Sequence, residues 1–347
     1  MLFNYKSLSV FLLLALSGCD NQFGDIFWPP EEEDVVCDTD TTAVSFKKVA
    51  YWSVDDDYDK DDLDLIDFSA LTHIVYSNVN VNSDGLIETL SDDDENALQD
   101  LVEYAQLAGV KVGVSLGDGN DNNFNSIAES TSLTRDFVKA VVGFIDDYEL
   151  DGVDMNWQTI NSGAESDNLE KLLAELQEDL SEDNKFLSMA VTSGEDDSQA
   201  DKVDSDLFDY VDFVNVMAFD STDKDDLHSS FEDAEEAITY WTGRCLIQNK
   251  LVLGVPFYSN DNDQDVDQSL SYDYIVDDNT DYACVDESEG RNYNGIPTII
   301  DKTSYALLYA GGIMMKSLEQ DAYENPKYLL LNVINETSNG NYVDICD

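Results

Sequence analysis

Leu150-Asp151-Gly152-Val153-Asp154-Met155-Asn156-Trp157-Gln158 is the stretch of this 347-residue chain that decides its fold. Alternate side chains of a β-strand point to the same side, so Asp154, Asn156 and Gln158 share one face, about 7 Å apart from one to the next. A row of carboxylates that faces a cleft can provide a general acid with a tuned pKa. Here the last two members of the row are amides, which have no titratable proton. The strand therefore has the spacing of catalytic machinery without its acids.

Short β-rich runs alternate with helical patterns from Lys47 onward, and the stretch above is the fourth of eight such runs. Near-continuous apolar strands separated by helices are typical of a parallel sheet, and eight repeats predict a closed (β/α)8 TIM barrel in a single domain, residues 45–347. Active sites of such barrels lie at the carboxyl ends of the strands, where Gln158 falls. The predicted strands are Lys48–Trp52, His73–Val79, Lys111–Leu116, Gly152–Trp157, Leu187–Val191, Phe213–Ala218, Leu251–Val255 and Gly312–Met315.

Helix signals lie between these strands. Ser91 followed by the acidic run Asp92–Glu95 predicts an N-cap and first turn, and Gly109 predicts the helix end. Two other segments place their apolar residues on one helical face. These residues are Phe137, Val141, Phe144, Ile145 and Tyr148 in the first segment, and Leu169, Leu172, Leu173, Leu176 and Leu180 in the second.

The composition is that of a packed but extremely acidic protein. Hydrophobic residues make up 43% of the chain, while 75 Asp and Glu oppose 17 Lys and Arg, for a net charge of −58. Such a field repels the phosphates of nucleic acids and the headgroups of anionic lipids, which excludes both as direct ligands. The excess of acids is interpreted as a solvated surface, suited to high salt.

The amino terminus resembles a targeting segment. Lys6 is followed by the apolar run Leu8–Leu16, which is too short to span a bilayer as a helix. Leu16-Ser17-Gly18-Cys19 resembles a bacterial lipobox, which predicts removal of residues 1–18 and a lipid on Cys19; an ordinary secretory signal is the alternative. Residues 19–44 contain Pro29-Pro30 and an acidic run, and are interpreted as a flexible acidic tether. We therefore expect an exported protein of the bacterial cell envelope, which touches the membrane only through this lipid.

Four cysteines remain once Cys19 is assigned to the lipid: Cys37, Cys245, Cys284 and Cys346. An even number in an exported protein suggests two disulfides, for which three connectivities exist, whereas free buried thiols are the alternative. Because Cys37 and Cys346 flank the globular region, we expect them to pair, which leaves Cys245 with Cys284.

From Val49 to Glu336 the chain resembles glycoside hydrolase family 18, the chitinase-like barrels. The family's fourth-strand signature DG-x-D-x-D-x-E corresponds to Asp151–Gln158. Motifs of four other strands follow in order. Ser115–Asp118 (SLGD) corresponds to S-x-G-G, Met217–Asp220 (MAFD) to M-x-Y-D, Gly254–Ser259 (GVPFYS) to G-x-P-F-Y-G, and Gly311–Lys316 (GGIMMK) to G-G-x-M-x-W.

The resemblance implies a reaction for which this chain lacks four groups. Family members cleave N-acetylglucosamine linkages with help from the substrate's own acetamide, an exception to two-carboxylate hydrolysis. The signature's final Glu protonates the leaving oxygen, and the Asp before it orients the acetamide; here they are Gln158 and Asn156. Phe219 lacks the hydroxyl of the family's Tyr, and Lys316 replaces the Trp on which the sugar stacks. The sequence therefore predicts that no residue of the degenerate motif is catalytic.

The resemblance also implies a glycan cleft lined by Tyr51, Asp154, Asn156, Gln158, Met217, Asp220 and Tyr258. Hydrogen bonding within the core is the alternative role for Asp154 and Asp220, and packing is the alternative for the two tyrosines. No cofactor is expected. A metal site is not expected either, because His73 has the context of a core residue and His228 lies in a polar loop. The acidic run Asp261–Asp267 lacks the glycine and final Glu of an EF-hand loop.

Three hypotheses follow. The first is an envelope lipoprotein that binds an N-acetylglucosamine-containing or related glycan without hydrolysing it. The second is a scaffold or protein-interaction module on a disused barrel, with the cleft filled by side chains such as Lys316. The third is an active glycosidase of the chitinase or endo-N-acetylglucosaminidase type, whose acid has moved to Asp118 or Asp220. The sugar, the membrane and the oligomeric state stay open.

Overall fold

The structure is a computed structural model that describes residues 37, 45–54, 58–117, 123–157, 160–194, 198–220, 228–261 and 269–346. They belong to one compact unit, Cys37–Asp347. The predicted signal peptide, the lipidation residue Cys19 and the predicted tether, apart from Cys37 itself, lie outside the described residues. Within the described part of the chain, no helix is both long enough and apolar enough to cross a bilayer.

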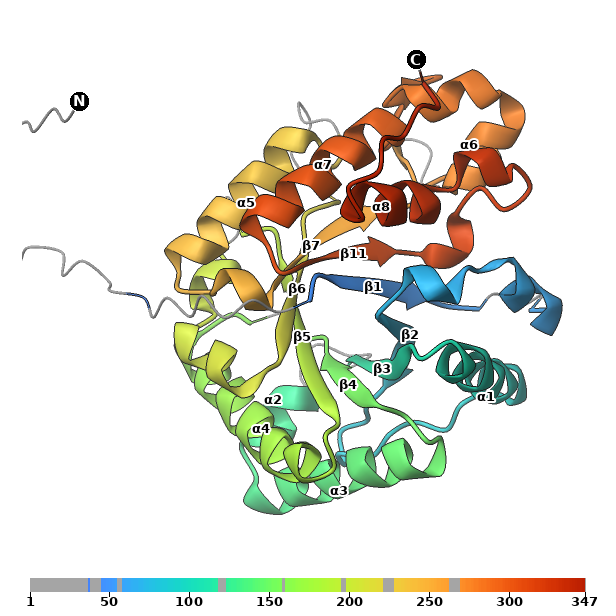
Figure 1. The fold of residues 1–347 in the computed structure, drawn as a ribbon. Helices are drawn as coiled ribbons and strands as arrows, with labels where there is room; N and C mark the ends of the chain where they lie inside the picture. Colours follow the sequence, from blue (N-terminus) through green and yellow to red (C-terminus); the bar gives the residue numbers. More distant parts are fainter. Residues whose placement is uncertain are drawn as a thin grey trace, which may run out of the picture. The chain divides into compact units, whose positions relative to one another are not determined.

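Eight parallel strands close into a barrel, as predicted (Figure 1). Around the barrel they follow the order β1-β11-β7-β6-β5-β4-β3-β2, so neighbours in the sequence are neighbours in space except where β8 to β10 intervene. The strands are β1 Lys47–Trp52, β2 His73–Asn80, β3 Lys111–Gly117, β4 Gly152–Met155, β5 Phe186–Thr192, β6 Phe213–Met217, β7 Leu251–Pro256 and β11 Gly312–Lys316.

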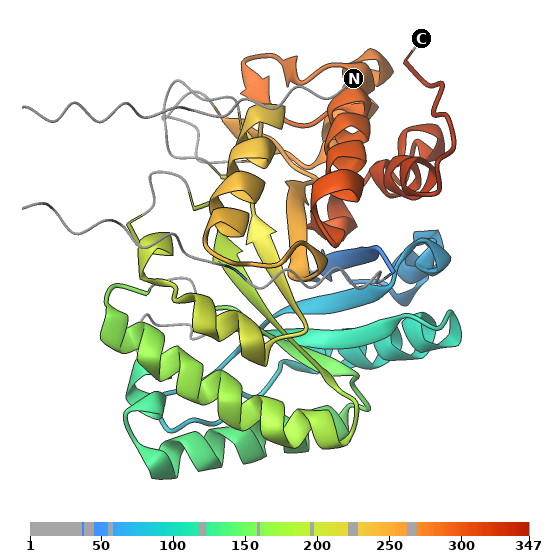
Figure 2. The ribbon, with the colours of Figure 1, turned by 60° about the vertical axis from the view of Figure 1, so that its left-hand side comes forward.

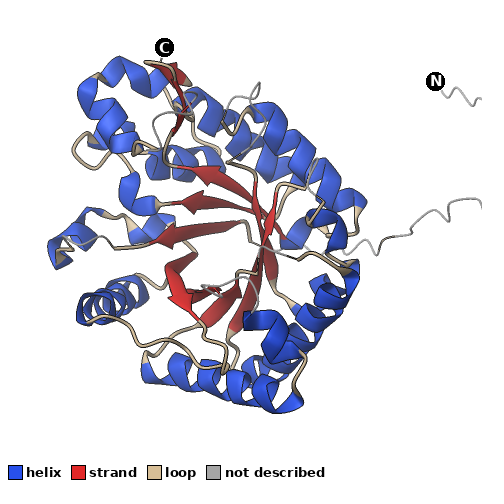
Figure 3. Cartoon of the chain, turned by 180° about the vertical axis from the view of Figure 1, so that it is seen from behind, coloured by secondary structure: helices blue, strands red, loops and turns tan. Residues whose placement is uncertain are grey.

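The helices surround the barrel (Figure 3). Ser91 caps α1 by accepting a hydrogen bond from Asp94 N, as predicted. The five leucines of α4 are buried, and α4 packs beside α3 (Figure 2). The α-helices are α1 Asp92–Leu107, α2 Asn123–Ala128, α3 Thr131–Asp147, α4 Gly163–Glu182, α5 Phe231–Gly243, α6 Tyr272–Asp278, α7 Ile296–Tyr309 and α8 Leu330–Ser338. The 3-10 helices are η1 Lys60–Leu65, η2 Phe68–Ala70, η3 Ala200–Lys202, η4 Ser205–Tyr210, η5 Gln248–Lys250, η6 Thr280–Cys284, η7 Leu318–Gln320 and η8 Pro326–Tyr328.

The core has two parts because each barrel strand buries both faces. The larger part lies between the strands and the helices. The smaller part fills the barrel interior with Val49, Tyr51, Val75, Phe186, Phe213, Val252 and Met314. His73 packs against the rings of Phe186 and Phe213 and accepts or donates a hydrogen bond at 2.9 Å with Thr72 Oγ1. The prediction that His73 is a core residue is confirmed.

A small element that the sequence did not reveal is inserted between β7 and α7. It consists of α6, η6 and a three-stranded antiparallel sheet of β8 Asn260–Asp261, β10 Arg291–Asn292 and β9 Glu287–Ser288. Strands of two residues carry no hydrophobic period, so no sequence pattern predicts them.

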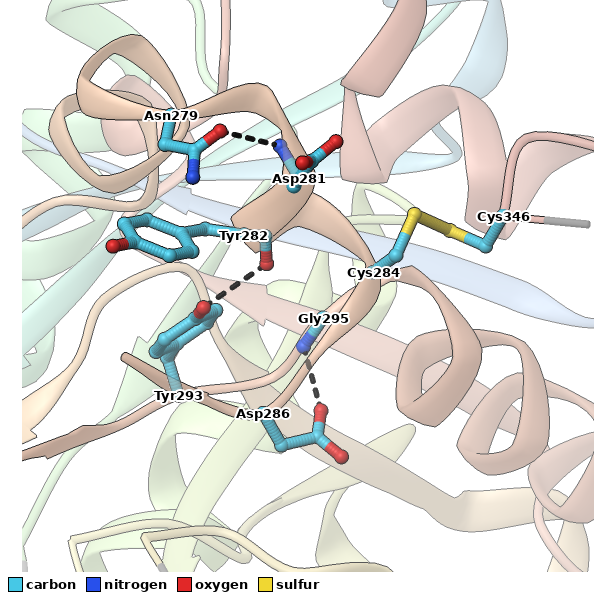
Figure 4. The surroundings of a disulfide bond; sticks show 8 residues. All are labelled: Asn279, Asp281, Tyr282, Cys284, Asp286, Tyr293, Gly295 and Cys346. Atoms are coloured by element: carbon cyan, nitrogen blue, oxygen red, sulfur yellow. Dashed lines mark hydrogen bonds between the residues drawn. A yellow bond between two sulfur atoms is a disulfide. The ribbon is translucent and has the colours of Figure 1, made fainter. Parts of the chain in front are cut away.

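The four cysteines Cys37, Cys245, Cys284 and Cys346 form two disulfides, as predicted, but the predicted pairing is wrong. Cys37 bonds to Cys245, and Cys284 bonds to Cys346 (Figure 4). Cys245 lies between α5 and η5, in the segment that leads into β7, so it lies where parallel strands begin, at the end of the barrel where the chain enters β1. Cys284 belongs to η6, in the insertion that follows the carboxyl end of β7. The topology of the parallel barrel thus determines which cysteines meet. Their nearness to the ends of the chain does not predict the pairing.

Candidate functional site

A buried carboxylate organises the barrel interior. Asp154 on β4 has no solvent exposure, and four side chains from four other strands donate hydrogen bonds to it. Tyr51 Oη and Ser115 Oγ reach Asp154 Oδ2 at 2.7 and 3.1 Å. Ser188 Oγ and Asn215 Nδ2 reach Oδ1 at 2.7 and 3.1 Å. Ser115 and Ser188 are register partners of Asp154, which explains their contact.

The protonation of this cluster follows from its burial. Desolvation raises the pKa of Asp154, and the four donated hydrogen bonds oppose that shift. Desolvation and the neighbouring Asp154 carboxylate raise the pKa of Tyr51 well above its usual value, so its hydroxyl stays a donor. Both Asp154 oxygens accept hydrogen bonds from within the barrel, and the predicted direct contact of Asp154 with a glycan stays a prediction.

The two ends of the fourth-strand motif have different surroundings. Asp151 lies before β4, where its Oδ2 accepts a hydrogen bond at 2.9 Å from Val112 N and ties β4 to β3. Asn156 lies directly after β4, half-buried, and its backbone N donates to Leu116 O at 3.0 Å. The amide of Asn156, which replaces a motif carboxylate, therefore lies just after the end of β4, at the carboxyl end of the barrel. Gln158 lies outside the described residues.

A second polar cluster follows β6 and β7. Tyr258 Oη donates to Asp220 Oδ2 at 2.8 Å, and the Asp220 side chain is 59% exposed. Desolvation raises the pKa of Asp220, while the Tyr258 hydrogen bond and the charge of Lys316 lower it. His228 is buried, with Nδ1 3.8 Å from Asp220 Oδ1 and with desolvation lowering its pKa to about 4. Phe219, which lacks a hydroxyl, packs edge-on against the Tyr258 ring.

A third polar group lies at the carboxyl end of β11 and in η7, which follows it. Lys316 Nζ lies over the Tyr51 ring, 5.6 Å from its centroid. Glu319, on η7, accepts hydrogen bonds from Ser53 N at 3.2 Å and from Ser53 Oγ at 3.1 Å. Desolvation raises the pKa of Glu319, and the Ser53 hydrogen bonds and the charge of Lys316 oppose this. One cation and two carboxyl groups thus lie near the same end of the barrel.

The structure brings the predicted residues together in pairs. Tyr51 contacts Asp154, and Asp220 contacts Tyr258. Met217 packs against the interior core cluster at the last position of β6. The cleft role of each residue stays a prediction, because these contacts are internal to the protein.

Sequence reasoning missed Ser188, Asn215 and Glu319. Ser188 and Asn215 are single polar residues inside apolar strands, on the face that points into the barrel. That pattern is a usable signal, because a buried polar side chain needs a partner. Glu319 follows the last barrel strand by three residues, in a helix too short to be recognised from a pattern.

The described residues form no group of three or more His, Cys, Asp or Glu side chains that could hold a metal ion. Asp118, a candidate for a relocated acid, lies outside the described residues, as do residues 262–267 of the acidic run. The described groups at this end of the barrel include hydrogen-bond donors, hydrogen-bond acceptors and charged side chains. Asn156, at the strand end, supplies an amide in place of an acid.

Comparisons with known proteins agree with this architecture. The family model for Glycosyl hydrolases family 18 matches residues 47–337. The GH18 chitinase ChiB from the chitin utilization locus of Flavobacterium johnsoniae is 28% identical, with a TM-score of 0.74 over 85% of this chain and 94% of that one. A Glu-to-Gln mutant of a class V chitinase from Nicotiana tobaccum, solved in complex with NAG4, is 17% identical, with a TM-score of 0.70 over 87% of this chain and all (100%) of that one.

Chitinase-3-like protein 2 of Homo sapiens is 24% identical over 228 residues, which cover 56% of this chain and 57% of that protein. The chain spans about half the length, or less, of the first curated relatives it matches. The match to the family model extends over the whole barrel, from the first residue of β1 to the penultimate residue of α8. The chain therefore belongs to glycosyl hydrolase family 18.

Proposed function

We propose that this chain binds an N-acetylglucosamine-containing or related glycan at the carboxyl end of its barrel and does not hydrolyse it by the family's reaction. The observation that carries the proposal is the amide at the strand end. Asn156 and Gln158 occupy the motif positions of the assisting carboxylate and the general acid. General acid catalysis is commonly worth about 10²–10⁴ in rate, and neither amide can supply it.

Retention of binding is supported by two further points. Gln and Asn match Glu and Asp closely in shape, so the substitutions remove charge while they preserve hydrogen bonding. The tobacco chitinase that holds NAG4 with Gln in place of Glu has the same fold. Tyr258 Oη lies beside Asp220 after the ends of β6 and β7, and in the barrel interior the buried Asn215 Oδ1 has no hydrogen-bond partner among the described residues.

We further propose that the protein is exported and anchored in the bacterial cell envelope by a lipid on Cys19. The support is the sequence alone: a positive residue, a short apolar run and a lipobox-like motif. Radiolabelled palmitate should enter the wild-type protein in its native host and should be absent from a Cys19→Ser variant. Equal labelling of both proteins would contradict the proposal.

The functional test incubates the purified chain with NAG4 and follows binding by calorimetry and cleavage by chromatography. The wild type should bind without cleavage. The Asn156→Asp, Gln158→Glu double variant should gain hydrolysis, because it restores the assisting carboxylate and the acid. A matched control adds the same two carboxylates at exposed positions of α1, as Asn96→Asp and Gln99→Glu, and should stay inactive.

The alternatives give different results in the same experiment. Cleavage by the wild type that disappears in Asp220→Asn would overturn the proposal in favour of a relocated acid, a role to which the exposure and raised pKa of Asp220 are suited. Absence of both binding and cleavage would favour a scaffold, in which Lys316 over Tyr51 fills the cleft.

A further inference from the structure

Lys316 faces the inside of the barrel at its carboxyl end. Met314, two residues earlier on β11, belongs to the interior core cluster and is 1% exposed. Because alternate residues of a strand point to the same side, Lys316 continues the interior face, one layer closer to the open end. The position of Lys316 Nζ 5.6 Å above the centre of the Tyr51 ring agrees with this direction, since Tyr51 is also an interior residue.

Lys316 forms no ion pair within the described part of the chain. Among the described residues, no acceptor forms a hydrogen bond with Lys316 Nζ and no carboxylate lies within 4.0 Å of it. The charge of Lys316 lowers the pKa of two carboxyl groups, but each of them accepts a hydrogen bond from another residue. Asp220 accepts one from Tyr258, and Glu319 accepts one from Ser53. The Tyr51 ring gives some stabilisation through a cation–π contact, but the three N–H donors of the ammonium stay unused.

The lack of an ion pair to Lys316 from the residues that the structure describes contrasts with a composition of 75 acidic and 17 basic residues. More than four acids are present for every base, yet no acid among the described residues forms an ion pair with this half-buried lysine, whose charge would benefit from one. The Tyr51 ring that faces the ammonium carries a buried hydroxyl, which accepts a hydrogen bond at 2.9 Å from Asn215 Nδ2.

We propose that the glycan bound here carries an anionic substituent, a carboxylate or a sulfate, which forms an ion pair with Lys316 Nζ. The inference rests on the proposed function and names the chemical class of its ligand. Asp220 and Glu319 limit that class to sugars with an isolated charge, because they would repel a polyanion. The overall net charge acts weakly on this contact, since at physiological ionic strength charges farther than about 8 Å are largely screened.

The test uses one oligosaccharide backbone in three forms: neutral NAG4, NAG4 with 6-O-sulfate, and NAG4 oxidised to a carboxylate at C6. Binding of each to the full chain is measured by calorimetry at about 0.15 M salt. The wild type should bind at least one charged form about tenfold more tightly than the neutral one, which is typical of a hydrogen bond to a charged group. Comparison of the sulfated and carboxylated forms identifies the substituent.

Variants then assign the preference to one side chain. Lys316→Met removes the charge at similar length and should bind all three forms alike, whereas Lys316→Arg should keep the preference. The matched control is Lys327→Met, because Lys327 on η8 also lies over a tyrosine, with Nζ 5.0 Å from the Tyr328 ring centroid, and is exposed. Its binding should be unchanged. Thermal unfolding of each variant confirms that it folds.

Each outcome decides one of the two proposals. If the wild type binds neutral NAG4 as tightly as both charged forms, or if Lys316→Met keeps the preference, the inference about Lys316 is wrong and the proposed glycan binding stands. If none of the three forms binds to the wild type, the proposed glycan binding fails and the inference fails with it.

Discussion

Lys302 shows how one residue can link the candidate site to protein stability. Its side chain on α7 is fully buried, and Nζ donates to Ser229 O at 2.5 Å, to Ser229 Oγ at 2.7 Å and to Asn294 Oδ1 at 2.8 Å. Ser229 is held at a φ of 54°, next to His228. Burial lowers the pKa of Lys302 to about 7, since the charged form loses its hydration.

This depressed pKa predicts a specific pH dependence of stability. The unfolded state keeps the Lys302 proton up to its usual pKa near 10.5, whereas the folded state releases it near 7. Between these values the unfolded state binds more protons, so the free energy of unfolding rises with pH. Between pH 7 and pH 9, the free energy of unfolding of the wild type should rise by about 2 kcal/mol more than that of Lys302→Met, measured by urea unfolding.

The control for this prediction is Lys139→Met, an exposed lysine on α3 whose removal should leave the pH dependence of the wild type intact. Parallel curves for the wild type and Lys302→Met across this pH range would show that Lys302 titrates normally and would contradict the prediction.

At the scale of secondary-structure elements, an element can be predicted from the sequence when its signal is a local pattern of residues. The eight barrel strands were predicted with ends within two residues of those observed, because each is an apolar run bounded by helix signals. The insertion between β7 and α7 was not predicted, since its two-residue strands are set by tertiary contacts such as Asp286 with the backbone of Gly295 (Figure 4).

The candidate site was predicted only in part for the same reason. Alternation along β4 placed Asp154 on the inner face, and the resemblance suggested Tyr51 and Tyr258. The partners Ser188 and Asn215 depend on the register of β5 and β6 against β4, which is a property of the closed barrel. The predicted disulfide pairing was wrong because the actual pairing also depends on which ends of the helices and strands meet in the folded barrel.

The two disulfides should differ in the stability they add. Cys37–Cys245 joins residues 208 positions apart, and Cys284–Cys346 joins residues 62 apart. If both act by restricting the unfolded chain, each contributes about 2–5 kcal/mol, and the longer loop contributes about 1 kcal/mol more. We therefore expect the Cys37→Ser, Cys245→Ser variant to be less stable than Cys284→Ser, Cys346→Ser in urea unfolding. The reverse order would show that the contacts of the insertion outweigh loop entropy.

At the scale of the whole molecule, the dominant feature is unbalanced charge. The net charge is −58, and the described residues contain few ion pairs, such as Lys60 with Asp100 and Arg244 with Asp201. Helix ends add to the imbalance. The last turns of α3 and α4 contain no basic residue, and each of these helices ends in acidic residues, where the helix dipole favours cations. Repulsion between negative charges is therefore stronger in the compact folded state than in the expanded unfolded chain.

Screening of this repulsion should stabilise the fold. Raising NaCl from 0.1 to 1 M shortens the screening length from about 10 to about 3 Å. The free energy of unfolding in urea should then increase, with the ends of α3 and α4 alone contributing about 0.3–1 kcal/mol each. KCl should give the same increase as NaCl, because screening depends on ionic strength and not on the ion. Guanidinium chloride, itself a salt, should report a higher extrapolated stability than urea at low salt. A stability that is independent of salt, or that responds to only one cation, would show that the acidic residues do not repel one another in the folded state or that they bind a specific ion.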